Sequence, residues 1–217
     1  NRVASMPYRQ VLDSADFRYA RAKLRASAGQ PAEAVTDLQD QLARAPQDDA
    51  LDYGLARALL RAGRLDEAEQ RVAALRKSAM ASSWVEGLAA EVRLARKDAA
   101  GAVRTLEAAQ KQFPANRSLA YALADARIHA GQAREAAAGV RRMIDTRSSD
   151  PRLWQLLSRA HAELGQRTAQ HRAQAEVYVL RGSLPAAIEQ LEIARKGGDG
   201  DFYELSAVDA RMRELKQ

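Results

Sequence analysis

Residues 63–72 read GRLDEAEQRV, and two other stretches of the chain share this pattern. GQPAEAVTDL occupies residues 29–38, and GQAREAAAGV occupies residues 131–140. Each stretch has a glycine, a short polar step, and then a small residue inside a helix-forming segment. The glycines at this phase are separated by 34 residues or a multiple of 34, and they are Gly29, Gly63, Gly131 and Gly165. A repeat of fixed length is therefore the main organising feature of the chain.

The repeat predicts pairs of antiparallel helices. Glycine permits the positive-φ turn that ends the first helix, and a small residue five positions later lets the second helix approach closely. Those small residues are Ala34, Ala68, Ala102 and Ala136. The phase position between Gly63 and Gly131 holds Lys97, which must adopt the turn at some cost or use a different one.

A single hairpin of this kind cannot bury its apolar face, so neighbouring hairpins stack. A 34-residue period with prolines near the ends of units, here Pro46 and Pro114, is typical of tetratricopeptide (TPR) repeats. We therefore predict an all-α fold, a TPR-type right-handed α-solenoid of about five to six helical hairpins with a C-terminal capping helix. The expected helices span residues 15–28, 31–44, 49–62, 65–78, 83–96, 99–112, 117–130, 133–147, 151–164 and 167–181.

The repeat changes register near the C-terminus. Gly182 follows Gly165 by only 17 residues, half a period. The segment GSLPAAIEQLEIA, residues 182–194, is then the second helix of a last hairpin, and the helix over 167–181 serves two units. A final helix begins near Asp201, where Glu204 has the spacing of a capping box. Its apolar stripe of Leu205, Val208, Met212 and Leu215 predicts a cap over the last repeat.

Composition and charge leave two classes of partner open. The chain has 217 residues, no cysteine, 47% hydrophobic residues and 5% aromatic residues, and its formal net charge is +6. Acidic residues stand four positions before basic ones in Asp40–Arg44, Glu67–Arg71, Glu192–Lys196 and Asp209–Arg213. This order favours ion pairs on solvated helix faces, although a net positive charge is also found in nucleic-acid binders. No stretch approaches the roughly 18 apolar residues of a transmembrane helix.

Residues with catalytic chemistry are sparse. His129, His161 and His171 form no His-x-x-x-His pair, and the chain has no cysteine to act as a metal ligand. His161 and Glu163 have the His-x-Glu pattern of zinc deaminases, but the cysteine half of that site is absent. We interpret His161 as an ordinary residue between helices. We expect the chain to have no enzymatic activity of its own and to bind no metal or cofactor.

The expected activity is recognition of a protein or peptide. In TPR solenoids the fifth and ninth positions of each first helix usually face the concave groove. The candidate partner-binding residues are Tyr19, Lys23, Tyr53, Arg57, Arg61, Tyr121, Asp125 and Arg159. Tyrosine offers a large contact area and arginine binds carboxylates with two hydrogen bonds. Tyrosine at this position also packs between helices, so groove contact and packing both remain open.

Both ends of the chain carry a more specific resemblance. NRVASMPYRQVLDSADFRYARAKLR, residues 1–25, resembles the segment after the catalytic domain of periplasmic zinc metalloproteases of the β-barrel assembly-enhancing type. Residues 175–217, AEVYVLRGSLPAAIEQLEIARKGGDGDFYELSAVDARMRELKQ, are similar to the C-terminus of the same proteins. The resemblance implies a parent with a signal peptide, an HExxH zinc site and a TPR domain. This chain contains no HExxH motif, so no catalytic residue can be assigned in it.

The resemblance also implies a domain organisation and a cellular role. Residues 1–14 are expected to link to a missing upstream catalytic domain that holds zinc, residues 15–181 to be the TPR repeats, and residues 182–217 the last helix and the cap. The expected location is the periplasm of a Gram-negative bacterium. There the chain would recruit outer-membrane β-barrel proteins or their assembly machinery to the protease, or contact its own catalytic domain.

Two alternatives remain beside this interpretation. One is a basic helical-repeat protein that binds nucleic acid, which would need arginines lined along one face. The other is a stand-alone TPR adaptor with no protease. We expect a monomer without a transmembrane segment, because a polar capping helix disfavours end-to-end stacking.

Overall fold

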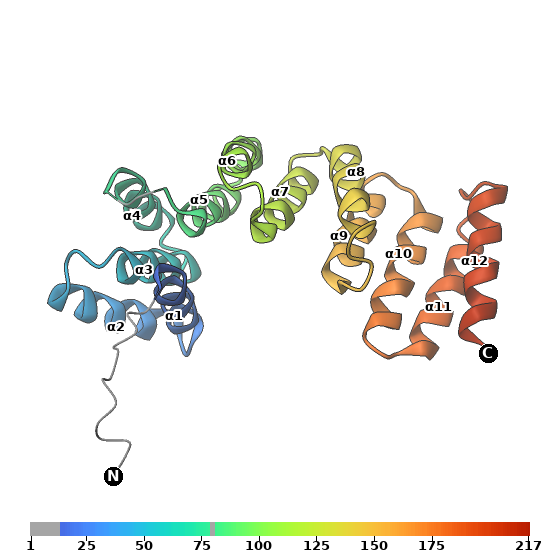
Figure 1. Ribbon diagram of the computed structural model, residues 1–217, viewed down its shortest axis with the longest axis horizontal. Helices are drawn as coiled ribbons and strands as arrows, with labels where there is room; N and C mark the ends of the chain where they lie inside the picture. Colours follow the sequence, from blue (N-terminus) through green and yellow to red (C-terminus); the bar gives the residue numbers. More distant parts are fainter. Residues whose placement is uncertain (1–13, 79–80) are drawn as a thin grey trace, which may run out of the picture. The chain divides into compact units, whose positions relative to one another are not determined.

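The computed structural model describes residues 14–78 and 81–217. Within these ranges the chain is all-α, as the repeat predicts, and forms consecutive antiparallel helices (Figure 1). The helices are α1 (Ala15–Ser27), α2 (Pro31–Arg44), α3 (Asp49–Arg61), α4 (Leu65–Ser78), α5 (Ser83–Ala95), α6 (Ala99–Gln112), α7 (Arg117–His129), α8 (Ala133–Ile144), α9 (Pro151–Glu163), α10 (Arg167–Leu180), α11 (Leu184–Arg195) and α12 (Phe202–Leu215).

The turns within the hairpins have the backbone conformation that the repeat predicts. The phase glycines have φ values between +56° and +73°, the left-handed region that glycine adopts without strain. Lys97 stands at the same phase and has φ +64°, the one non-glycine residue with positive φ in the described part of the chain. Of the two alternatives that the sequence leaves open at Lys97, the structure shows the glycine turn, and the β-carbon of Lys97 makes that conformation costly.

The helix ends agree with the sequence to within one residue at most positions. Ser14, Asp48, Asp98, Asn116 and Asp150 each accept a hydrogen bond from the first turn of their helix, which fixes where the helix begins. The expectation for residues 133–147 is wrong at its C-terminal end, because α8 stops at Ile144.

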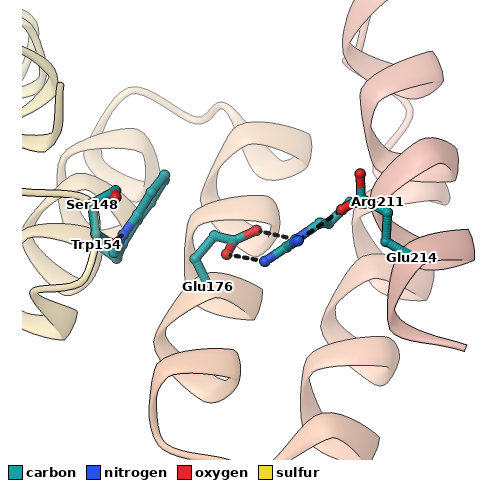
Figure 2. Close-up of polar contacts among 5 residues, drawn as sticks. All are labelled: Ser148, Trp154, Glu176, Arg211 and Glu214. Atoms are coloured by element: carbon teal, nitrogen blue, oxygen red, sulfur yellow. Dashed lines mark hydrogen bonds and ion pairs between the residues drawn. The ribbon is translucent and has the colours of Figure 1, made fainter. Parts of the chain in front are cut away.

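The loop after α8 has its own hydrogen bonds. Thr146 Oγ1 donates to the carbonyl oxygen of Met143 at 3.1 Å. Trp154 Nε1 donates to the carbonyl oxygen of Ser148 at 2.7 Å (Figure 2). These bonds give the backbone a different conformation from a continued helix.

The chain forms two compact units, which divide between Val92 and Arg93. In the first unit, α1 and α2 pack against α3, and the small residues at the repeat phase lie in the core: Ala34 is 8% exposed and Ala68 is fully buried. A β-carbon added at Gly54 on α3 would lie 3.2 Å from Ala22 Cβ on α1. The two helices therefore approach closely at this glycine.

The second unit contains the helices from α6 to α12. Ala136 on α8 packs with Leu153 and Leu157 on α9, and all three are buried. Helix α10 packs against both α9 and α11, so the prediction that one helix serves two hairpins is confirmed. The three helices lie side by side in Figure 1.

Helix α12 covers the last hairpin as the expected cap. Val208 and Met212 from its apolar stripe are buried with Leu191 of α11 and Ala175 of α10. The predicted capping box between Asp201 and Glu204 is present at its N-terminus. The cap is thus joined to the repeats by an apolar contact, and its first turn has the hydrogen bonds expected from the sequence.

An ion pair also ties α12 to α10. Arg211 Nε donates to Glu176 Oε1 at 2.8 Å, and Arg211 Nη2 donates to Glu176 Oε2 at 2.9 Å. Figure 2 shows this guanidinium between Glu176 and Glu214, and its Nη1 donates to Glu214 Oε2 at 2.7 Å. These hydrogen bonds raise the pKa of Arg211 and so favour its charged form.

One expected ion pair is replaced by another. Arg71 Nη1 lies 3.0 Å from Asp52 Oδ1 on α3, and Glu67 pairs with Arg64 instead. The i,i+4 pair predicted between Glu67 and Arg71 is therefore wrong, because a carboxylate on the neighbouring helix faces Arg71. The expected linker at residues 1–14 lies outside the described residues, apart from Ser14.

Candidate functional site

Three aromatic rings from consecutive hairpins meet in the first unit. Tyr19 on α1 and Tyr53 on α3 have ring centroids 5.2 Å apart in an edge-to-face arrangement. Trp84 at the start of α5 stacks on Tyr19 at 6.2 Å and meets Tyr53 edge-on at 6.1 Å. Its indole Nε1 donates to Asp16 Oδ1 at 2.8 Å. The rings join the first helices of three hairpins into one aromatic base.

The two tyrosines of this base are largely buried. Tyr53 is 1% exposed and Tyr19 is 8% exposed. Burial raises the pKa of Tyr53 to about 12 and also raises the pKa of Tyr19. Packing is therefore the observed role of both rings, one of the two roles that the sequence leaves open. Charged groups surround the rings.

Lys23, Arg57 and Glu91 are those charged groups. Lys23 is exposed, and its Nζ lies 5.9 Å from the centroid of Trp84. Arg57 Nη1 lies 3.1 Å from Glu91 Oε1, and Arg57 also lies over the ring of Tyr53 at 5.9 Å. We call Lys23, Arg57 and Glu91, together with the aromatic base of Tyr19, Tyr53 and Trp84, the α1–α3–α5 face.

Arg61, unlike the other predicted residues of the first unit, donates side-chain hydrogen bonds to backbone carbonyl oxygens. Its Nη1 donates to the carbonyl oxygen of Ala26 at 2.5 Å, and its Nη2 donates to the carbonyl oxygen of Gly29 at 3.2 Å. These carbonyls lie at and just beyond the C-terminus of α1. Arg61 therefore satisfies backbone acceptors at the end of a helix and joins α3 to α1.

Tyr121, Asp125 and Arg159 belong to the second unit. The hydroxyl of Tyr121 donates to Asp150 Oδ2 at 2.7 Å, and burial raises its pKa, with the carboxylate adding to that shift. Arg159 on α9 pairs with Asp125 on α7, and His129 Nε2 lies 3.8 Å from Asp125 Oδ2. The predicted residues thus fall into two groups, one in each unit. The first unit contains Tyr19, Lys23, Tyr53, Arg57 and Arg61, and the second contains Tyr121, Asp125 and Arg159.

The sequence prediction missed Trp84 and the pairing of the charges. Trp84 stands outside the fifth and ninth positions of its repeat, so counting positions could not select it. A signal for the pairing was available, because Arg57 and Glu91 are opposite charges separated by one period of 34 residues. Asp125 and Arg159 have the same separation.

His161 is a buried interhelical residue, as the sequence indicates. It is 3% exposed; its Nε2 lies 3.2 Å from Arg141 Nη2, and its Nδ1 lies 2.6 Å from Gln166 Oε1. Because a guanidinium can only donate, Nε2 accepts and Nδ1 carries the proton. Burial lowers the pKa of His161, which keeps the ring neutral.

Among residues 14–78 and 81–217, no three His, Cys, Asp or Glu side chains lie close enough together to hold a metal ion. In the same ranges, no helix has the length and apolar character needed to cross a membrane.

Sequence comparison relates the chain to known repeat proteins. A family model described as tetratricopeptide repeat matches residues 25–91 and 93–160. The β-barrel assembly-enhancing proteases of Escherichia coli K12 and Shigella flexneri are each 30% identical to it over 220 residues. The match covers 100% of this chain but 45% of either relative, so the chain spans less than half the length of these proteases.

Solved structures of repeat proteins share the fold. MamA from Desulfovibrio magneticus RS-1 superposes with a TM-score of 0.60 at 19% identity, covering 79% of this chain and 97% of that one. YrrB, described as a TPR protein with an unusual peptide-binding site, superposes with a TM-score of 0.56 at 12% identity. That match covers 81% of this chain and 91% of YrrB. At these identities the likeness concerns the fold alone.

Proposed function

This chain belongs to the tetratricopeptide repeat family, and from that premise we propose that it is the protein-recognition part of a larger zinc metalloprotease. The observation that carries the proposal is the α1–α3–α5 face. Its aromatic base joins three consecutive hairpins, and charged groups of both signs surround that base. A face of this kind can bind a polypeptide segment through its backbone and its charged side chains.

The packing of the aromatic base supports binding. The rings of Tyr19, Tyr53 and Trp84 already pack against one another, so they lose little conformational entropy when a ligand binds to the charged groups around them. Lys23 and Glu91 keep exposed polar groups, the Glu91 side chain being 44% exposed, whereas that of Arg57 is 16% exposed. In the second unit, Asp125 and Arg159 keep the same proposed role, and their side chains are 33% and 43% exposed.

The identity of the relatives supports the link to a protease. The match extends over the whole chain, including both ends, where the repeat alone does not explain the residues. We infer a parent in which a separate HExxH domain holds the zinc, with residues 1–14 as the linker. The relatives come from Gram-negative bacteria, and we propose a periplasmic location for this protein as well.

We further propose that the bound proteins are outer-membrane β-barrel proteins or components that assemble them. The support is the printed name of the relatives, β-barrel assembly-enhancing protease. In this role the repeats recruit a substrate, and the catalytic domain of the same parent is a second binding partner. Since the α1–α3–α5 face is charged, its affinity for such a partner should decrease with salt.

A binding measurement with the 217-residue chain tests the proposal. A fluorescently labelled, urea-unfolded β-barrel protein is diluted into increasing concentrations of the chain, and anisotropy gives the dissociation constant. We expect Lys23→Glu to weaken binding at least fivefold. The matched control is Lys77→Glu on α4, which makes the same charge reversal at an exposed position away from this face. Equal binding by both variants would refute the role of the face.

Binding measurements and the parent gene also test the two alternative functions, nucleic-acid binding and a stand-alone adaptor. The arginines of the ninth positions, Arg57 and Arg159, are both paired with carboxylates, which disfavours a stripe of free cations for nucleic acid. Tighter binding of single-stranded RNA than of the unfolded β-barrel protein would reverse that view. A stand-alone adaptor predicts a parent gene that encodes no HExxH motif.

A further inference from the structure

A basic pocket lies in the second unit, between α7 and α8. It has a volume of about 330 Å³, and the loops that precede α7 and follow α8 contribute to its lining. We call it the basic pocket and define it by Arg117, Arg127, Gly139, Arg142, Met143 and Arg147. None of these residues belongs to the α1–α3–α5 face or to the residues that the repeat positions select.

The charge of the basic pocket is entirely positive. Four of its lining residues are arginines, and no lining residue is acidic. Arg127 Nη2 is held by Glu107 Oε1 at 2.9 Å. For Arg117, Arg142 and Arg147, the structure shows no ion pair or side-chain hydrogen bond within residues 14–78 and 81–217. Three guanidinium groups around one cavity are thus available to an anion.

One arginine of the basic pocket has a buried donor without a partner. Arg127 Nε is buried and has no hydrogen-bond partner among the described residues. Arg127 comes from α7 and lines the pocket. The Arg127 guanidinium therefore has one N–H group that its pairing with Glu107 leaves unsatisfied, which is costly.

The rest of the lining is apolar and small. Leu123 and Ala124 from α7 and Ala136 and Met143 from α8 contribute aliphatic surface beside the arginines. Gly139 leaves space on the α8 side, since a β-carbon there would have no atom nearer than 4.0 Å, and its two nearest neighbours are the guanidinium ends of Arg127 and Arg142. Methionine adapts its shape to varied apolar groups. The pocket can therefore hold an apolar side chain next to an anion.

We propose that the basic pocket binds an acidic segment of a partner polypeptide, with a carboxylate on the arginines and a neighbouring apolar side chain against Leu123 and Met143. Arginine pairs with carboxylates in a two-bond geometry, and the aliphatic surface favours a peptide over a bare phosphate. This site is separate from the proposed α1–α3–α5 face, and either can be wrong without the other.

Three synthetic peptides test the pocket by titration calorimetry on the whole chain. The first is amidated and carries glutamates between leucines, the second replaces the glutamates by glutamine, and the third has leucines with only a free C-terminal carboxylate. We expect the first to bind at least tenfold more tightly than the second. The third peptide tests whether a chain terminus can supply the carboxylate. Stronger binding of the third than of the first would overturn the assignment to an acidic segment.

Variants then place the peptide in the pocket. Gly139→Leu fills the space without removing a hydrogen bond, and Arg142→Gln removes one guanidinium; each should weaken the first peptide at least tenfold. Arg134→Gln, an exposed arginine on the same helix outside the lining, is the matched control and should bind normally. Unchanged binding by Arg142→Gln and Gly139→Leu, with both variants folded by circular dichroism, would refute the pocket. Equal or tighter binding of inorganic phosphate or single-stranded RNA would refute the peptide assignment.

Discussion

Arg57 Nη1 lies 3.1 Å from Glu91 Oε1, and the two residues occupy the same position in consecutive repeats, 34 residues apart. Asp125 and Arg159 form an ion pair with the same separation. In a solenoid, equivalent positions of neighbouring repeats lie side by side, so opposite charges one period apart can meet. The charges that the sequence assigns to a binding groove therefore also join one hairpin to the next.

The coupling between Arg57 and Glu91 can be measured by a double-mutant cycle. Arg57→Gln, Glu91→Gln and the double variant are compared by urea unfolding. We expect a coupling free energy of about 0.3–1 kcal/mol, because the Glu91 side chain is 44% exposed and solvent screens the pair. The coupling should decrease in 1 M salt. Strictly additive effects of the two substitutions would show that the pair does not stabilise the stack.

Lys97 is the position where substitution by glycine should stabilise the protein. Its φ of +64° is unfavourable for a residue with a β-carbon, and glycine removes that strain. Because glycine also makes the unfolded chain more flexible, we expect Lys97→Gly to raise the free energy of unfolding by only about 0.5–1 kcal/mol.

Gly63 provides the reverse control for Lys97. Its φ is +73°, and a β-carbon there would meet no atom within 4 Å. Gly63→Ala should therefore lower the free energy of unfolding by about 1 kcal/mol through backbone strain alone. Thermal unfolding followed by circular dichroism measures both variants. A destabilised Lys97→Gly would mean that the lysine side chain makes a contribution larger than the strain.

The buried hydroxyl of Tyr53 should make the free energy of unfolding decrease at alkaline pH. Burial raises its pKa to about 12, whereas tyrosine in an unfolded chain titrates near 10. The unfolded chain releases the phenolic proton first, so this contribution is complete below pH 10 and is lost as the pH rises from 10 to 12. The loss amounts to about 2–3 kcal/mol by linkage.

Urea unfolding at several pH values between 9 and 12 measures that loss. Tyr53→Phe should flatten the dependence, although it also removes the hydroxyl that faces Arg57. Tyr203→Phe, at a ring that is 81% exposed, is the control and should leave the alkaline loss unchanged. If the free energy of unfolding of Tyr53→Phe depends on pH as that of the unsubstituted chain does, another group causes the alkaline loss of stability.

Arg211 is expected to hold the capping helix on the repeats. Arg211→Lys keeps the charge but cannot form the two parallel bonds to Glu176, and we expect it to cost about 1–2 kcal/mol. Hydrogen exchange should become faster in α12 before it changes elsewhere, because a terminal element can open locally. Arg213→Lys, exposed on the same helix, is the matched control. Equal exchange in both variants would contradict a role for the ion pair.

Much of the fold could be predicted because its signals are local. The turn at Gly165 needs a residue that tolerates positive φ, and Asp201 with Glu204 forms a capping box from residues three positions apart. Such preferences act over a few residues and recur every 34 residues, so they can be recognised in the sequence without a structure. The end of α8 was misplaced because the loop after it depends on bonds such as that between Trp154 and Ser148.

The sequence by itself determined the helical repeat, its turns, the shared helix α10 and the cap, since each depends on local conformation and on periodic burial. Only the tertiary structure decided that Tyr53 is buried, that Arg57 is paired with Glu91 and that Trp84 joins the aromatic base. It also decided that Arg142 and Arg127 surround one pocket. Whether a polar side chain meets a partner or a neighbour depends on what other helices place opposite it, and position within a repeat does not specify that.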